Sequence, residues 1–157
     1  MKKVLIVLFA SFLFIQFFPI DKVNQPVDPG MDFIRIKKTP ENIAATLKAS
    51  CYDCHSNETV YPWYANVQPF GWFLKDHIEE GRKHLNFSTF ATYLPKRQAH
   101  KLAESAEMVQ NKEMPLDSYV LGHPEADLTH QQRTELVQYF QQIEKELRLL
   151  NDLPPEQ

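Results

Sequence analysis

Apolar residues recur at intervals of three and four along most of the chain, a spacing that predicts amphipathic helices. The clearest case follows Thr129-His130-Gln131-Gln132, whose Thr-x-x-Gln form predicts a capping box. Because no segment alternates apolar and polar residues as a half-buried strand does, we expect an all-α domain with long loops. The apolar positions of the last predicted helix are Leu136, Val137, Phe140, Ile143, Leu147 and Leu150.

Proline and hydroxyl residues mark where further helices begin. Thr39-Pro40-Glu41 predicts a helix with Thr39 as its N-cap and Pro40 at its first position, leading into Cys51. A second helix is expected over residues 72–84 and a third over 95–110, where proline comes early. Asn86-Phe87-Ser88 predicts a break between these two, followed by a new N-cap.

The segment that follows Lys3 differs from the rest of the chain because none of its faces is polar. Lys2 and Lys3 precede an apolar run over residues 4–18, the pattern of an export signal. No small-x-small cleavage site and no lipoprotein-type cysteine follows. We therefore expect an uncleaved signal-anchor helix over residues 1–20, with a cleaved signal peptide as the alternative. The positive residues in front of it place the remaining chain on the outer, extracytoplasmic or periplasmic face of a membrane.

The rest of the chain divides into three parts. Residues 21–38 contain two prolines and a glycine among polar residues, so we expect a linker. Residues 39–150 are long enough to bury one core, and residues 151–157 form a flexible tail. The formal net charge is −3 with both signs scattered, and the absence of a basic stripe argues against a nucleic-acid partner.

Both cysteines lie in Cys51-Tyr52-Asp53-Cys54-His55, which has the pattern C-x-x-C-H. This pattern is typical of covalent c-type haem attachment, in which two thiols add to the porphyrin vinyl groups and the imidazole binds iron. A dithiol or disulfide pair is a second interpretation, but no strand pattern precedes the motif. A structural zinc site is a third, but it takes four N or S ligands and the chain has no second cysteine pair. The export signal favours haem, because bacteria attach c-type haem outside the cytoplasm.

Aromatic residues are dense after the motif. Trp63 and Trp72, the two tryptophans of the chain, lie in the aromatic clusters 61–64 and 69–73. We expect these clusters to form a wall of the haem pocket, with indole N–H groups available to the haem propionates. Ordinary core packing is the alternative.

The candidates for a second axial ligand of the iron are the methionines and histidines of the chain. Met114 is preferred, because it lies in a loop and is followed by Pro115, so its thioether can reach iron without breaking a helix. Met108 falls within a helical pattern, for which core packing is expected. His123 and His77 are the histidine alternatives, and an open or water-bound sixth position is another.

Taken together, these segments resemble the bacterial haem-binding-domain family of cytochrome c-like proteins over roughly residues 35–145. The resemblance implies a cytochrome c-like helical domain around one covalently attached haem c per chain. It also implies that the first and last helices of the domain pack across each other. The matching segments are Ser50–Asn57, Tyr61–Tyr64, Asp76–Arg82, Glu113–Leu116, Ser118-Tyr119 and His123-Pro124.

Carried over by position, the resemblance implies Cys51 and Cys54 as the thioether residues and His55 as the proximal iron ligand. Met114 matches the Met-Pro distal ligand of many cytochromes c. The carbonyl that orients the imidazole stays open between the two prolines of residues 62–69.

The expected function is electron transfer by a membrane-tethered monohaem cytochrome that meets redox partner proteins. A haem enzyme or ligand sensor of the peroxidase type, with an open sixth iron site, is the alternative. A module that holds a CxxC disulfide and no haem is a third hypothesis.

Overall fold

The computed structural model describes residues 1–154, and these residues form helices and loops with no strand among them, which confirms the all-α prediction. Three short 3-10 segments, η1 (Trp63–Asn66), η2 (Phe87–Thr92) and η3 (Pro124–Ala126), lie between the helices. The helices are α1 (Lys2–Ile15), α2 (Phe33–Ile36), α3 (Glu41–Ser50), α4 (Tyr52–His55), α5 (Phe70–His84), α6 (Pro95–Gln110), α7 (Asp117–Val120) and α8 (His130–Leu150).

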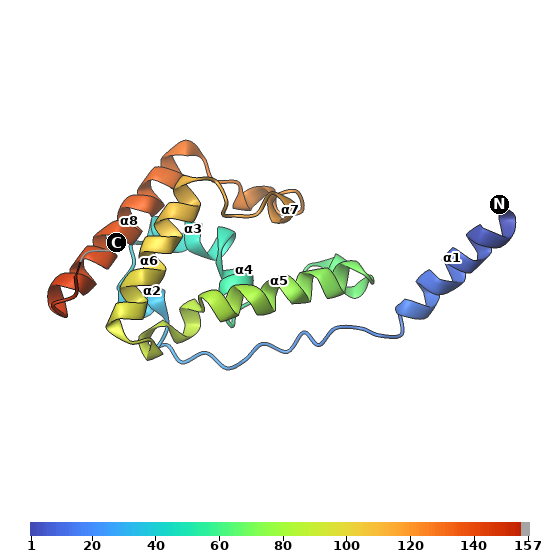
Figure 1. The fold of residues 1–157 in the computed structure, drawn as a ribbon, viewed down its shortest axis with the longest axis horizontal. Helices are drawn as coiled ribbons and strands as arrows, with labels where there is room; N and C mark the ends of the chain where they lie inside the picture. Colours follow the sequence, from blue (N-terminus) through green and yellow to red (C-terminus); the bar gives the residue numbers. More distant parts are fainter. Residues whose placement is uncertain (155–157) are drawn as a thin grey trace.

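Helices α6 and α8 form an antiparallel pair that is the main packing unit of the domain (Figure 1). Helix α6 has the bounds that the sequence predicts, and Thr129 and Gln132 form the predicted capping box of α8. Helix α3 contacts α8, so the first and last helices of the domain do meet, although α8 packs chiefly along α6.

Phe33 lies at the centre of the core and is completely buried. It belongs to α2, which contacts η2. Four aromatic rings have centroids 4.9 to 6.3 Å from that of Phe33, and they belong to Phe87, Phe90, Tyr139 and Phe140. Aromatic pairs at such separations add to the stabilisation that burial alone provides.

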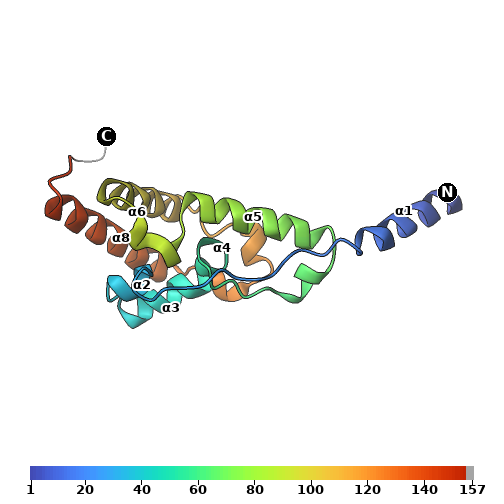
Figure 2. The ribbon, with the colours of Figure 1, turned by 90° about the horizontal axis from the view of Figure 1, so that it is seen from below.

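The segment expected to be a linker ends inside the domain. Asp32 caps α2 by accepting a hydrogen bond from the Arg35 backbone N–H at 3.3 Å, and its other oxygen accepts from the Tyr52 hydroxyl at 3.0 Å. Upstream, the extended chain passes α5, where Arg82 donates to the Asn24 side chain at 3.1 Å (Figures 1 and 2). Only the first part of residues 21–38 is therefore a linker, because the last part contributes contacts to the core.

The N-cap of α3 differs from the prediction. The helix begins at Glu41, one residue later than expected, and Thr39 does not cap it. The Thr39 hydroxyl instead accepts a hydrogen bond from the Tyr139 hydroxyl at 2.9 Å, which joins the start of α3 to α8. A tertiary contact thus takes the oxygen that the local pattern assigns to capping.

Helix α1 stands apart from the domain (Figures 1 and 2). Its large apolar side chains are exposed except for that of Ile15, which is half-buried. The helix covers 14 residues, less than the expected segment 1–20. Within residues 1–154, no helix combines the length and the apolar character needed to cross a membrane. At the other end of the chain, residues 151–154 follow α8 without forming a helix, and the rest of the predicted tail, 155–157, lies outside the described residues.

The Phe33→Ala substitution should lower the free energy of unfolding by about 3–5 kcal/mol, because it leaves a cavity among four rings. Urea denaturation followed by circular dichroism measures this loss. Leu149→Ala, at an exposed position of α8, should cost no more than about 0.5 kcal/mol. Equal losses in both variants would show that Phe33 does not organise the core.

Candidate functional site

The five residues Cys51–His55 form a single helical turn at the end of α3. The Cys51 carbonyl accepts hydrogen bonds from the backbone N–H groups of Cys54 at 3.2 Å and His55 at 2.9 Å. This turn brings the side chains of Cys51, Cys54 and His55 to one cavity of about 400 Å³. A cavity of this size is typical of small-molecule and cofactor sites.

The turn is anchored on the core by Tyr52, which points away from the cavity. Its ring stacks on Phe87 with centroids 5.3 Å apart and planes 5° from parallel, and Phe87 stacks in turn on Phe140. Its hydroxyl donates to Asp32. Because Tyr52 points into the core, its neighbours in the turn are free to line the cavity.

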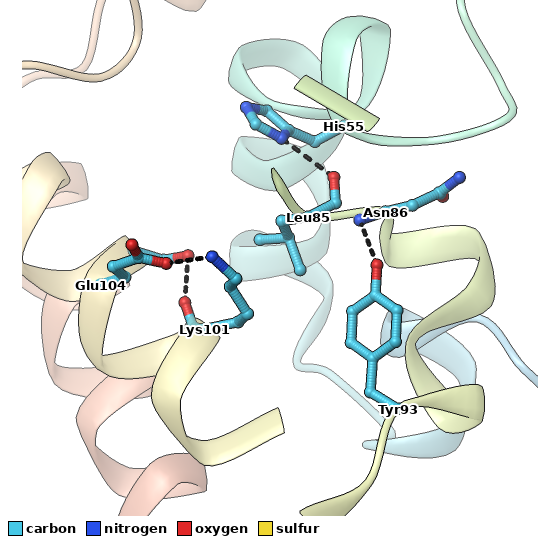
Figure 3. A network of polar contacts seen from close by, with 7 residues as sticks. His55, Leu85, Asn86, Tyr93, Lys101 and Glu104 are labelled. Atoms are coloured by element: carbon cyan, nitrogen blue, oxygen red, sulfur yellow. Dashed lines mark hydrogen bonds and ion pairs between the residues drawn. The ribbon is translucent and has the colours of Figure 1, made fainter. Parts of the chain in front are cut away.

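His55 is oriented by the carbonyl of Leu85, the residue that follows α5, which lies 3.1 Å from Nδ1 (Figure 3). A carbonyl oxygen only accepts, so Nδ1 carries the proton and Nε2 keeps its lone pair for another partner. Burial lowers the pKa of His55, which favours the neutral imidazole. A neutral histidine with a free Nε2 is the form that binds metals. The carbonyl that orients His55 belongs to Leu85, and not to Pro62 or Pro69.

The backbone at Leu85 is itself fixed by the residue after it. The Asn86 backbone N–H donates to the Tyr93 hydroxyl at 2.9 Å (Figure 3), and the Asn86 side chain donates to Asn57 at 2.8 Å. Since Asn57 follows the motif closely, the carbonyl and the imidazole belong to one connected hydrogen-bond network.

Gly81 allows α5 to touch the motif. A Cβ atom built on Gly81 would lie 2.8 Å from the Cys54 carbonyl oxygen and 3.3 Å from the Cys54 Cβ. The nearest obstacle is backbone, which cannot rotate away as a long side chain does. Glycine at this position is therefore what lets α5 approach closely enough for Leu85 to reach His55.

Met114 lines the same cavity as His55, although the two residues are far apart in the sequence. Its loop is tied to the ends of two helices. The Met114 N–H donates to the Met108 carbonyl at 3.2 Å, and Arg133 of α8 donates to the carbonyls of Val109 at 2.6 Å and Met114 at 3.1 Å. These bonds hold the predicted second ligand at the cavity.

Asp53 links the motif to α7 beyond this loop. Its Oδ2 accepts from the Tyr119 hydroxyl at 2.7 Å, and its Oδ1 accepts from the Val60 N–H at 2.8 Å. Burial and the hydrogen bond to Asp53 raise the pKa of Tyr119, so this phenol stays protonated and donates. Tyr119 lines the cavity, and the bond closes one side of it.

Trp63 and Trp72 were both expected to form a wall of the haem pocket, but neither lines this cavity. Trp63 is 79% exposed and lines a neighbouring cavity of about 430 Å³, which shares Cys54 with the first. Trp72 lines neither, and its indole N–H donates to the Phe18 carbonyl at 2.9 Å. The indole that was expected to meet a propionate is thus bonded to the chain after α1.

The two histidines considered as alternative ligands lie in different places. His77 lines both cavities, and its Nδ1 lies 2.9 Å from the Phe73 carbonyl. His123 lines neither cavity and stacks on the Tyr119 ring at 4.1 Å. Of these two histidines, only His77 lies at the site.

Sequence reasoning assigned Met108 to core packing, but Met108 lines the cavity together with Glu104. The sequence carries a sign of this position, because Glu104 and Met108 are four residues apart and share one face of α6. A carboxyl on that face indicates contact with solvent or a cavity. Lys101 donates to Glu104 at 2.5 Å and lowers the pKa of that carboxyl (Figure 3).

The chemistry of the two free thiols argues against a redox dithiol. Burial raises the pKa of Cys51 to about 12 and that of Cys54 to about 11. Reactive cysteines in CxxC pairs have lowered pKa values, because the thiolate is the nucleophile. Among residues 1–154, no three His, Cys, Asp or Glu side chains gather as a metal-binding group.

A family model described as a haem-binding domain matches residues 10–142, which is most of the chain. No curated protein and no solved structure matches it significantly.

The Gly81→Ala substitution should destabilise the protein by about 1–3 kcal/mol, because the new methyl group collides with the Cys54 backbone. Urea denaturation measures the effect. Gly122→Ala is the matched control, since a Cβ there would meet the nearest atom, on the Tyr64 ring, at an ordinary 3.6 Å. Equal stability of Gly81→Ala and the wild type would disprove the close approach of α5.

Proposed function

The chain belongs to the haem-binding domain family, and from this we propose that it is a monohaem c-type cytochrome-like protein. Haem is its cofactor, and the covalent attachment, the single haem per chain and the role in electron transfer are our proposal. The observation that carries it is the turn Cys51–His55, which presents two thiols and one imidazole with a free Nε2 to one cavity.

The residues of the cavity fit a c-type haem. Cys51 and Cys54 would hold the porphyrin through two thioether bonds, and His55 Nε2 would bind the iron. Haem held in this way supplies an iron that accepts and releases one electron. Burial, which lowers the pKa of His55, keeps the imidazole neutral, and the Leu85 carbonyl fixes the required tautomer. A hydrogen bond of this kind raises ligand basicity.

Met114 would be the second ligand, because its loop places it at the cavity and its backbone is held at both ends. A thioether in this position raises the reduction potential relative to a second histidine. The protein would exchange electrons with redox partner proteins.

We also propose that α1 holds this domain at the outer face of a membrane. The apolar side chains of α1 are exposed except for the half-buried Ile15, and the two lysines lie at the start of the helix. The positive residues favour a cytoplasmic N-terminus and an extracytoplasmic domain.

The covalent bond is tested by the intact mass of protein exported from a host that attaches haem. We expect the mass of the chain plus one haem, and a pyridine haemochrome spectrum of the c type. A Cys51→Ser/Cys54→Ser double variant should carry no covalent haem. Haem that is bound but separates from the chain on denaturation would contradict thioether attachment, and a colourless product would contradict the whole proposal.

The second ligand is tested by comparing Met114→Leu with Met108→Leu, two substitutions of equal size at one cavity. Loss of a thioether ligand should make Met114→Leu high-spin and lower its midpoint potential by on the order of 100 mV, within the range that axial ligands set. The Met108→Leu variant should keep the wild-type spectrum. The reverse result would assign the ligand to Met108, and a high-spin wild type would favour the enzyme or sensor alternative.

A further inference from the structure

The corner where η1 leads into α5 is an uncharged aromatic surface. Residues 61–74, which we call the aromatic corner, contain no Asp, Glu, Lys, Arg or His. Both tryptophans of the chain lie within it. Its large exposed apolar side chains are Trp63, Phe70, Trp72 and Phe73.

The aromatic corner is joined to the end of α1 by hydrogen bonds. Gln16 donates through Nε2 to the Gln68 carbonyl at 2.9 Å, and its Oε1 accepts from the Gln68 N–H at 2.8 Å. Trp72 donates to the Phe18 carbonyl at 2.9 Å. Both ribbon views place the end of α1 beside this corner (Figures 1 and 2).

These bonds make the exposed surface of α1 and that of the corner continuous. Phe17 and Phe18, which connect them, are also exposed. A helix of 14 residues is about 21 Å long, shorter than the roughly 30 Å of a bilayer core. An apolar helix inserted to its end would therefore bring the corner down to the lipid headgroups.

We propose that the aromatic corner is a lipid-contacting surface that lies in the interfacial region of the membrane. The inference rests on the proposed insertion of α1. Tryptophan and other aromatic side chains favour this region, where an apolar ring contacts the acyl chains and the indole N–H reaches a polar acceptor. Residues 61–74 carry no charged side chain that contact would dehydrate. Lys22, which donates to Asn66 at this corner, has a long side chain whose ammonium group can stay among the polar headgroups.

This orientation has a consequence for the haem cavity. The corner forms one wall of the second cavity through Trp63, Phe70 and Phe73, and that cavity also contains Cys54. The cysteine side of the haem site therefore faces the membrane, whereas α6 and α8 lie at the far end of α5 (Figure 1).

Trp63 and Trp72 make intrinsic fluorescence a reporter for this corner alone. The full-length haem-loaded protein is reconstituted into vesicles of phosphatidylethanolamine and phosphatidylglycerol, prepared with acyl chains either brominated near the carbonyl or unbrominated. Quenching by haem is the same in both, so the ratio of emissions reports lipid contact. We expect the tryptophan emission to be clearly lower in brominated than in unbrominated vesicles, because an interfacial surface lies about 5–10 Å into the boundary between headgroups and acyl chains, close to the bromine atoms.

Two variants make the assignment specific. Phe70→Glu/Phe73→Glu should restore most of the emission in brominated vesicles, because charge lifts the corner out of the lipid. Leu149→Glu, an exposed apolar residue at the far end of α8, should leave quenching unchanged. Protein that sediments with the vesicles without quenching would overturn the inference and leave the anchor intact. Protein that stays in the supernatant would overturn both, and neither result affects the haem content measured on the same sample.

Discussion

The hydrogen bond between His55 Nδ1 and the Leu85 carbonyl is the interaction on which the site depends. It determines the tautomer of the imidazole, and the tautomer leaves Nε2 available to the iron that we propose it binds. Leu85 can offer its carbonyl because it lies just beyond α5, where helical carbonyls lack partners within the helix. The bond also requires α5 to touch the motif, which Gly81 permits. A backbone atom, a glycine and a helix end thus orient the proposed ligand.

Each residue of the motif has its own structural task. Four of the five residues line the cavity and Tyr52 is stacked into the core, while Asp53 is in addition bonded to Tyr119. These two intervening residues therefore hold the turn from opposite sides. The arrangement explains how a turn of five residues can stay in place beside a large cavity. Its support comes from the aromatic core on one side and from α7, which follows the loop that carries Met114, on the other.

The sequence predicts the elements of this site better than their contacts. Capping and apolar spacing predict the bounds of α6 and the start of α8, because these are local properties. The motif and Met114, which line one cavity, could be singled out from the sequence because each has a side-chain signature. A carbonyl has none, so Leu85 could not be predicted. Thr39 and Trp72 were misplaced for a shared reason: Tyr139 and the Phe18 carbonyl, both distant in the sequence, take their hydrogen-bonding groups.

The most direct test of the account is a pH titration of His55 by NMR in the reduced, haem-loaded protein, with histidine labelled with nitrogen-15. If Nε2 binds iron and Nδ1 donates to Leu85, the His55 ring should show one protonated nitrogen and no titration between about pH 5 and 8. The Nδ1 proton should exchange slowly with solvent, because it is held in the hydrogen bond to the Leu85 carbonyl. A His55 ring that titrates in this range, or whose proton resides on Nε2, would contradict the account.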